Sequence, residues 1–153
     1  LVYDAIARSD ICLPSQDDVQ QLTGLSDADA LADHCLRPGA RTVALKLGAA
    51  GALVADAHAR HRIAPHPCHS VDATGAGDTF GGAFVARRLA GDSLLEAGRY
   101  AAVAAALSTE GYGAVAPIPD AAAVRRASSA HAARIRSSST VTTSAPLCST
   151  AVT

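Results

Sequence analysis

The residues best suited to chemistry lie in one stretch, VDATGAGDTF, at residues 71–80. Gly75, Ala76 and Gly77 are small enough for their backbone to approach a ligand closely. A helical pattern follows them to about residue 89, so they should lie at a helix N-terminus, where free amides and the helix dipole attract a phosphate. Asp78 falls in the first helical turn. Its carboxylate either compensates the dipole or acts as a general base beside a phosphoryl group.

The glycine spacing excludes two common phosphate-binding motifs. No third glycine completes the G-x-G-x-x-G of a dinucleotide-binding fold, and no Gly-Lys-Ser/Thr follows as in a P-loop. A G-x-G before a helix is weak evidence by itself, since it is also an ordinary structural turn. The ten residues together are far more specific. They resemble the C-terminal signature of the PfkB/ribokinase carbohydrate kinases, Asp-x-x-Gly-Ala-Gly-Asp-x-Phe.

Other motifs follow in the order of that family. Residues 46–51, KLGAAG, resemble its nucleotide-contacting turn, and Lys46 is the only lysine of the chain. Residues 15–18, SQDD, lie where the family has Asn-x-x-Glu. Residues 13–15, 46–48 and above all 106–119 are most similar to the 2-dehydro-3-deoxygluconate (KDG) kinases. Ala102 stands where many relatives have an asparagine near adenine.

The resemblance implies a role for each matching residue. Asp78 would bind the substrate hydroxyl and take its proton, while the amides of Gly75, Ala76 and Gly77 would face the transferred phosphoryl group. ATP and Mg²⁺ would be the cofactors, with a monovalent cation such as K⁺ as a further option. The residues expected to contact the nucleotide are Ser15, Lys46, Leu47, Gly48, Ala49, Ala50, Gly51, Gly77, Ala102 and Thr109. The residues expected at metal ions are Asp18, Asp72 and Thr74. The loop of residues 106–119 is expected to border the adenine pocket.

The intervening elements predict an α/β fold. The resemblance narrows this to a ribokinase-like three-layer α/β/α architecture with a mainly parallel sheet, of which this chain forms only the C-terminal portion. Strands are expected at 10–14, 42–47, 52–56 and 60–64. Helices are expected at 1–8, 15–24, after Ser26, at 76–89, at 93–108 and briefly after Pro119. Gly81 and Gly82 are expected to permit close packing of the fourth helix.

The expected domain organisation is a kinase portion over residues 1–126 and a disordered Ser/Thr/Ala-rich tail over 127–153. The chain begins with Leu1, and the sugar-binding part of the family domain is not in it. The implied function is ATP-dependent phosphorylation of a sugar or sugar acid, most closely KDG, with little activity from this chain alone. Two alternatives stay open: a non-catalytic remnant that binds nucleotide or a partner chain, and another sugar kinase of the ribokinase or fructokinase type.

Composition excludes several other classes. Hydrophobic residues make up 49% of the chain, which rules out disorder throughout. No apolar run is long enough for a membrane span and no signal peptide is visible, so a cytoplasmic protein without a membrane partner is expected. All fourteen acidic residues precede residue 121, which argues against nucleic-acid binding. A full-length homo-oligomer is left open.

The cysteines and histidines offer one rival hypothesis. The four cysteines have no C-x-x-C spacing and are interpreted as reduced thiols. Four histidines and a cysteine fall within twelve residues and could bind a metal, although Pro65 and Pro67 interrupt them. The residues of that alternative are His58, His61, His66, Cys68 and His69.

Overall fold

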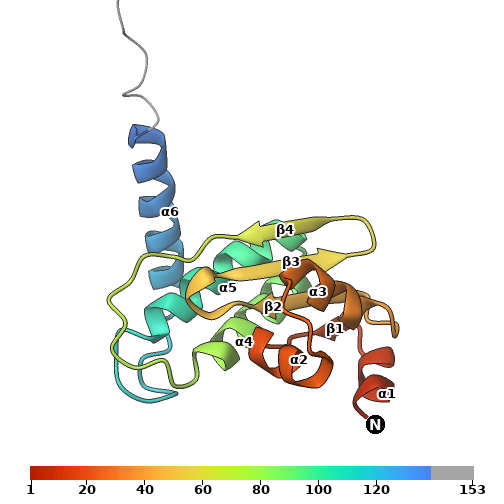
Figure 1. The fold of residues 1–153 in the computed structure, drawn as a ribbon. Helices are drawn as coiled ribbons and strands as arrows, with labels where there is room; N and C mark the ends of the chain where they lie inside the picture. The colour runs from red at the N-terminus through yellow and green to blue at the C-terminus, as the bar shows by residue number, and fades with distance from the viewer. Residues whose placement is uncertain (139–153) are drawn as a thin grey trace, which may run out of the picture.

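The computed structural model describes the backbone of residues 1–138 and the side chains of residues 1–130. Its elements alternate between helices and short strands along the chain (Figure 1). In order they are α1 (Val2–Ala7), β1 (Ile11–Cys12), α2 (Gln16–Thr23), α3 (Ala28–Leu36), β2 (Thr42–Lys46), the 3₁₀ turn η1 (Gly48–Ala50), β3 (Ala52–Asp56), β4 (Arg60–Ile63), α4 (Ala76–Leu89), α5 (Leu94–Ser108) and α6 (Ala121–Ser138).

The four strands form one mixed sheet in the order β1-β2-β3-β4. β1 pairs with β2 in parallel, whereas the β2–β3 and β3–β4 pairs are antiparallel. The expectation of a mainly parallel sheet is therefore wrong for the strands that are described. The reason is chain length: the connections from β2 to β3 and from β3 to β4 are too short for a parallel crossover, which needs a dozen or more residues.

Helices cover both faces of the sheet, as the three-layer prediction requires. Side chains alternate along each strand, so neighbouring residues enter different cores. Val43, Leu45 and Leu53 pack with Val19 and the residues of α3. On the opposite face, the sheet residues Ala44, Ala52, Val54 and Ile63 pack against α4 and α5.

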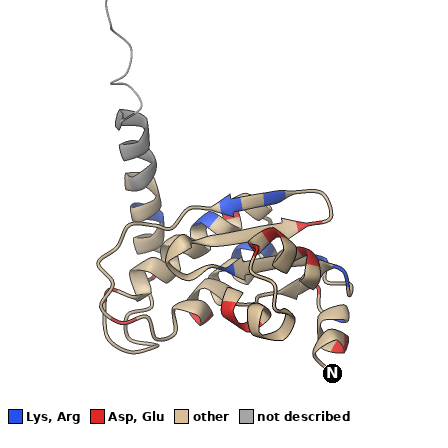
Figure 2. Cartoon of the chain, viewed as in Figure 1, with Lys and Arg blue, Asp and Glu red and all other residues tan. Residues whose placement is uncertain are grey.

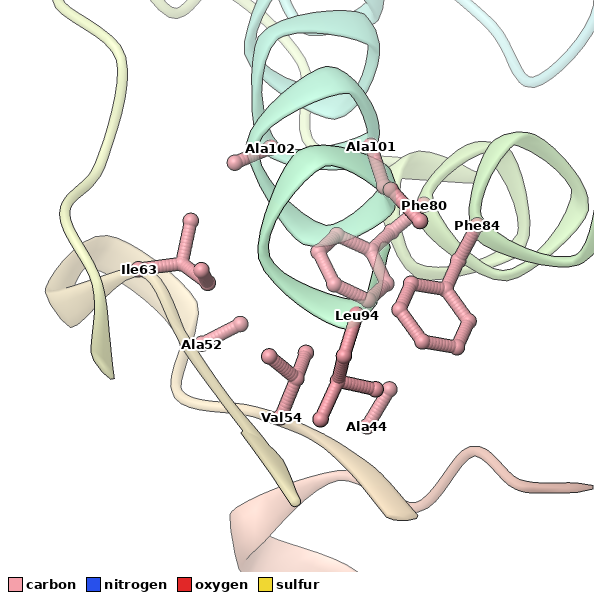
Figure 3. Packing of buried hydrophobic residues seen from close by; sticks show 10 residues of the cluster. Ala44, Ala52, Val54, Ile63, Phe80, Phe84, Leu94, Ala101 and Ala102 are labelled. Atoms are coloured by element: carbon pink, nitrogen blue, oxygen red, sulfur yellow. The ribbon is translucent and has the colours of Figure 1, made fainter. Parts of the chain in front are cut away.

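This second core fixes the position of α4, and with it the position of the part of the 71–80 motif that begins this helix. Phe80 and Phe84 of α4 lie against Leu94 and the sheet (Figure 3), with their ring centroids 6.2 Å apart. α5 comes close to the sheet because Gly98 has no side chain: a Cβ there would lie 3.0 Å from Ile63. Gly81 likewise allows close approach, with Leu13 3.4 Å from such a Cβ, whereas Gly82 faces open space.

The helix boundaries follow local capping. Ser15 accepts the amide of Asp18 at the start of α2, and Gly24 ends that helix in the left-handed conformation. Ser93 and Glu96 form a complete capping box on α5. The helix expected after Ser26 begins one residue later than that cap would place it, because the cap of α3 is Asp27, whose side chain accepts the amide of Ala30.

The structure of the C-terminal segment differs from the prediction of a disordered tail from residue 127. α6 continues to Ser138, so residues 127–138 are helical rather than disordered. Ala and Arg, both strong helix formers, supply much of that segment. The expectation for residues 139–153 lies outside the described residues. None of the described helices is long and apolar enough to cross a membrane.

Charged residues on α3 and β4 link two layers. Figure 2 shows basic residues gathered on β4 and acidic residues on α2 and α3. Arg60 of β4 forms ion pairs with Asp29, at 2.9 Å, and with Asp33. Arg62 also pairs with Asp29, and these bonds hold the pKa of Asp29 below its usual value. All these side chains are partly exposed, so the network contributes little stability at ordinary salt concentrations.

Stability should depend on the aromatic contact beneath α4. We expect Phe84→Ala to lower the free energy of unfolding by about 3–5 kcal/mol, because a large buried ring leaves a cavity. The control is Leu89→Ala in the same helix, where the side chain is 83% exposed. Urea denaturation measures both. Equal losses in the two variants would contradict the assigned core.

Candidate nucleotide site

The N-terminus of α4 is built by a tight turn ahead of it. Gly75, the residue before the helix, has φ +77°, a left-handed conformation that glycine adopts without strain. Its Cα faces the loop after α5, where a Cβ would lie 2.9 Å from the Cβ of Ala114. Position 75 thus needs glycine for two independent reasons.

Asp72 ties that turn to the loop after α5. One carboxylate oxygen accepts the amide of Thr74 at 2.9 Å, and the other accepts the amide of Gly113 at 2.8 Å. The Gly113 bond is the main reason that the pKa of Asp72 lies below its usual value, followed by the bonds from Thr74. The carbonyl of Thr109 also accepts the amides of Val71 and Asp72, at 2.7 and 3.0 Å. The contacts of Asp72 therefore support a loop-ordering role.

The amides ahead of α4 are mostly available to a ligand. Within the described part of the chain, the N–H groups of Gly75, Gly77 and Asp78 donate no hydrogen bond. Ala76 differs, because its N–H donates to the carbonyl of Ala73 at 3.1 Å. The expectation that Ala76 offers a free amide is therefore wrong: the turn itself uses that donor.

Lys46 reaches the same point from the end of β2. Its ammonium nitrogen lies 3.4 Å from where a Cβ on Gly77 would be. The backbone amide of Lys46 donates to Pro14 at 3.0 Å, and η1 begins two residues later. No acidic side chain forms a salt bridge with Lys46 among the residues described. A cation thus faces the positive end of a helix, an arrangement that an anion would stabilise.

A cavity of about 340 Å³ opens from this point. It runs between η1, the segment that follows β4, the N-terminus of α4 and the alanine-rich face of α5. The predicted nucleotide contacts among its lining residues are Lys46, Gly48, Ala49, Gly51, Gly77, Ala102 and Thr109. Ala76, predicted to face the transferred phosphoryl group, also lines it. Phe80 closes one side from α4.

Several predicted residues do not line this cavity. Leu47 packs into the core below α2 and α3, and Ala50 lies on the exposed side of η1. Ser15 bonds to Asp18 as the cap of α2. Asp78 is exposed directly after Gly77 and forms no ion pair with another described residue.

The 106–119 stretch borders the cavity only in part. Ala106 and Thr109 line it. The glycine-rich part instead supports the α4 turn through Gly113 and Ala114, leaving Tyr112 80% exposed.

The segment that follows β4 supplies wall residues that sequence reasoning missed. Pro65, His66, Cys68 and Ser70 all line the cavity. Pro65 and Pro67 precede the 71–80 motif and favour an extended backbone, which fits a segment at the mouth of the cavity. The alternative hypothesis from the sequence gives the histidines of this segment the role of metal ligands. Among residues with described side chains, no group of three or more His, Cys, Asp or Glu could hold a metal.

Comparison with known proteins identifies the family. The model of the pfkB family of carbohydrate kinases matches residues 2–121, and the chain belongs to that family. The ribokinase of Haemophilus influenzae is 36% identical over 121 residues, covering 76% of this chain and 40% of the relative.

Solved structures agree with this fold. A protein described as a ribokinase II of E. coli, in complex with ATP and Mg²⁺, superimposes with a TM-score of 0.78 at 28% identity, over 85% of this chain and 42% of that one. Arabidopsis thaliana ribokinase in complex with ribose and ATP gives 0.76 at 29% identity, over 82% and 43%. The chain thus spans less than half the length of these relatives.

The conformation at Gly75 can be tested against a matched glycine. We expect Gly75→Ala to lower the free energy of unfolding by about 1–3 kcal/mol, because it combines strain at positive φ with a clash at Ala114. Gly82→Ala, in the open middle of α4, should instead stabilise by about 0.5–1 kcal/mol. Thermal and urea unfolding measure both. A neutral Gly75→Ala would rule out the tight turn.

Proposed function

We propose that this chain binds the phosphates of ATP between Lys46 and the N-terminus of α4, as the nucleotide-binding part of a sugar kinase. One observation carries the proposal: Lys46, which has no acidic partner in the described chain, lies beside Gly77 at the N-terminus of α4, where the amides of Gly75 and Gly77 donate no hydrogen bond. A cation close to the positive end of a helix favours an anion between them. A phosphate offers several oxygens to these donors at once.

The rest of the nucleotide fits the cavity beyond that point. Ala102, Ala105 and Ala106 give α5 a smooth apolar wall, on which a flat base can lie. The polar side chains closest to such a base are those of His66, Ser70 and Thr109. The hydroxyl of Thr109 already donates to the carbonyl of Ala106 at 2.7 Å.

Asp78 is placed to act as the general base. It follows the anion site by one residue, and its carboxylate is exposed toward any incoming substrate. As a sugar hydroxyl attacks the terminal phosphorus, Asp78 takes its proton. The amides of Gly75 and Gly77, with Lys46, stabilise the charge on the transferred group.

Metal ions would neutralise the phosphate charge that Lys46 and the helix N-terminus leave unbalanced. Mg²⁺ neutralises phosphate charge during transfer. The described residues offer no cluster of three protein ligands, so Mg²⁺ would take most of its ligands from phosphates and water. Asp18, the carboxylate that the family resemblance proposes for Mg²⁺, lines a different cavity from the one beside Lys46. A monovalent cation at Asp72 and Thr74 is a further proposal from the family resemblance.

The substrate class is a sugar or sugar acid with a free hydroxyl. Named relatives include ribokinases, and solved neighbours were crystallised with ribose and with fructose. KDG is the narrower proposal, and it rests on the similarity of residues 13–15, 46–48 and above all 106–119 to the KDG kinases. A chain that binds nucleotide without transferring phosphate is the second candidate, because it spans less than half of its relatives.

Lys46 provides the direct test of the anion site. We expect Lys46→Met to weaken binding of Mg·ATP about 10–100-fold, the loss of one charge-assisted contact of about 1.5–3 kcal/mol. Isothermal titration calorimetry measures it. The control is Arg41→Met, an 83% exposed cation that pairs with Asp10, and it should bind as the wild type does. If both variants lose affinity equally, or if neither does, the site is wrongly assigned.

Asp78 provides the test of chemistry. In a full-length kinase that contains this chain, Asp78→Asn should lower kcat by about 10²–10⁴-fold while the affinity for ATP stays nearly constant. A coupled assay of ADP formation with ribose, fructose and KDG measures this and ranks the sugars. The control is Asp4→Asn, an exposed acid on α1. A mild effect on kcat would remove Asp78 from the role of base, and ATP binding without transfer to any sugar would favour the second candidate.

A further inference from the structure

Two cysteines from different elements meet on the face of the sheet opposite α4. Cys12 ends β1, and Cys35 lies in the last turn of α3. Both belong to the core formed by α3 and the sheet, and both are free thiols. Both side chains line one cavity, and each thiol shifts the pKa of the other. The two thiols therefore share one wall of that cavity, although 22 positions separate the residues in the sequence.

A second cavity gives small molecules access to this pair. It has a volume of about 470 Å³ and is lined by residues of α1, β1, α2 and α3, with both cysteines in its wall. Cys12 is half-buried, whereas Cys35 is only 1% exposed. A small oxidant entering the cavity would reach Cys12 before Cys35. The other polar groups at this wall are Asp18 and His34.

Exposure gives the two thiols different chemical roles, because Cys12 is the accessible one and Cys35 is buried. The interaction with Cys35 lowers the pKa of Cys12 to about 7, against the opposing effect of burial. The interaction with Cys12 and burial raise the pKa of Cys35. Cys12 is thus the thiol that loses its proton more readily. A thiolate is the reactive nucleophile, and a neighbouring thiol can resolve its oxidised form.

We propose that Cys12 and Cys35 form a peroxide-sensitive dithiol that closes to an internal disulfide. The Cys12 thiolate attacks hydrogen peroxide, forms a sulfur–oxygen bond and releases hydroxide, which gives a sulfenic acid. The sulfur of Cys35 then attacks that of Cys12, and the S–OH bond breaks. The thiol proton of Cys35 leaves with the hydroxyl as water. Overall, two thiols and one peroxide become one disulfide and two water molecules, and a dithiol reductant reverses the change.

The crosslink would join β1 to α3 close to the anion site. Cys12 is two residues before Pro14, whose carbonyl accepts the amide of Lys46. Cys68 is the contrasting thiol: it is exposed, and its sulfur lies 3.6 Å from the hydroxyl of Thr109 rather than beside another cysteine. Oxidation should therefore select the Cys12–Cys35 pair over other pairings.

The experiment uses the full chain with C68S and C148S, which leaves only Cys12 and Cys35. After treatment with hydrogen peroxide under native conditions, intact mass spectrometry should show the loss of two hydrogens in most molecules. Peptide mapping without reductant should join the peptides of Cys12 and Cys35, and dithiothreitol should separate them. Adding C35S should stop the disulfide and leave a sulfenic acid at Cys12 that dimedone traps, whereas adding C12S should leave Cys35 reduced.

A second measurement covers the risk that replacing buried Cys35 unfolds the chain. With both thiols present, native alkylation by iodoacetamide should be at least about 10-fold faster at Cys12 than at Cys35, and the two rates should converge in denaturant. The proposal is overturned if peroxide yields separate sulfinic acids or intermolecular disulfides in place of the internal bond. It is also overturned if Cys35 is alkylated first in the native protein.

Discussion

The structure depends on an electrostatic constraint at the start of α4. The ammonium group of Lys46 lies beside Gly77, at the positive end of the helix, where the amides of Gly75, Gly77 and Asp78 donate no hydrogen bond within the described chain. Like charges at such short range are costly unless a counter-charge sits between them. The described chain supplies no acidic side chain in an ion pair with Lys46. The phosphate that we propose at this site would supply that counter-charge from outside the chain.

The surrounding fold keeps these two positive groups in place. Lys46 ends β2, which is hydrogen-bonded on both sides, to β1 and to β3. α4 is fixed by its aromatic contact with the sheet and by α5, whose small residues allow close approach (Figure 3). Asp72 then fixes the turn before α4 by accepting amides from both sides. Rigid placement of donors is the main way in which a protein accelerates phosphoryl transfer.

Much of this could be predicted from the sequence, because it is encoded locally. Gly75 in its left-handed turn, the caps Ser15 and Ser93, and the strands on either side of η1 follow from short-range rules. The mixed sheet was predictable too, since the few residues between β2 and β3 permit only a hairpin. That length rule is a stronger signal than the pattern of alternating helices and strands.

The remaining features depend on contacts between distant residues. Three interactions join segments that no local pattern connects. They are the bond from Gly113 to Asp72, the close approach of Ala114 to Gly75 and the proximity of Cys12 and Cys35. The bond from Ala76 to Ala73 is local, but a helix pattern alone does not predict it. An ordinary helix start would leave the amide of Ala76 free, whereas in this turn it donates to the carbonyl of Ala73. The sequence pattern does not predict the full length of α6, because serines interrupt the Ala- and Arg-rich segment that forms the helix.

The central claim concerns particular amide groups, so it is tested most directly by following them one by one. In ¹⁵N–¹H correlation spectra of the labelled chain, titration with Mg·ATP should move the amide signals of Gly75, Gly77 and Asp78 most. The amide of Ala76, already bonded to Ala73, should move less. If these signals stay in place while ATP binds, or if ATP shifts only residues outside the cavity beside Lys46, the anion site described for α4 is contradicted.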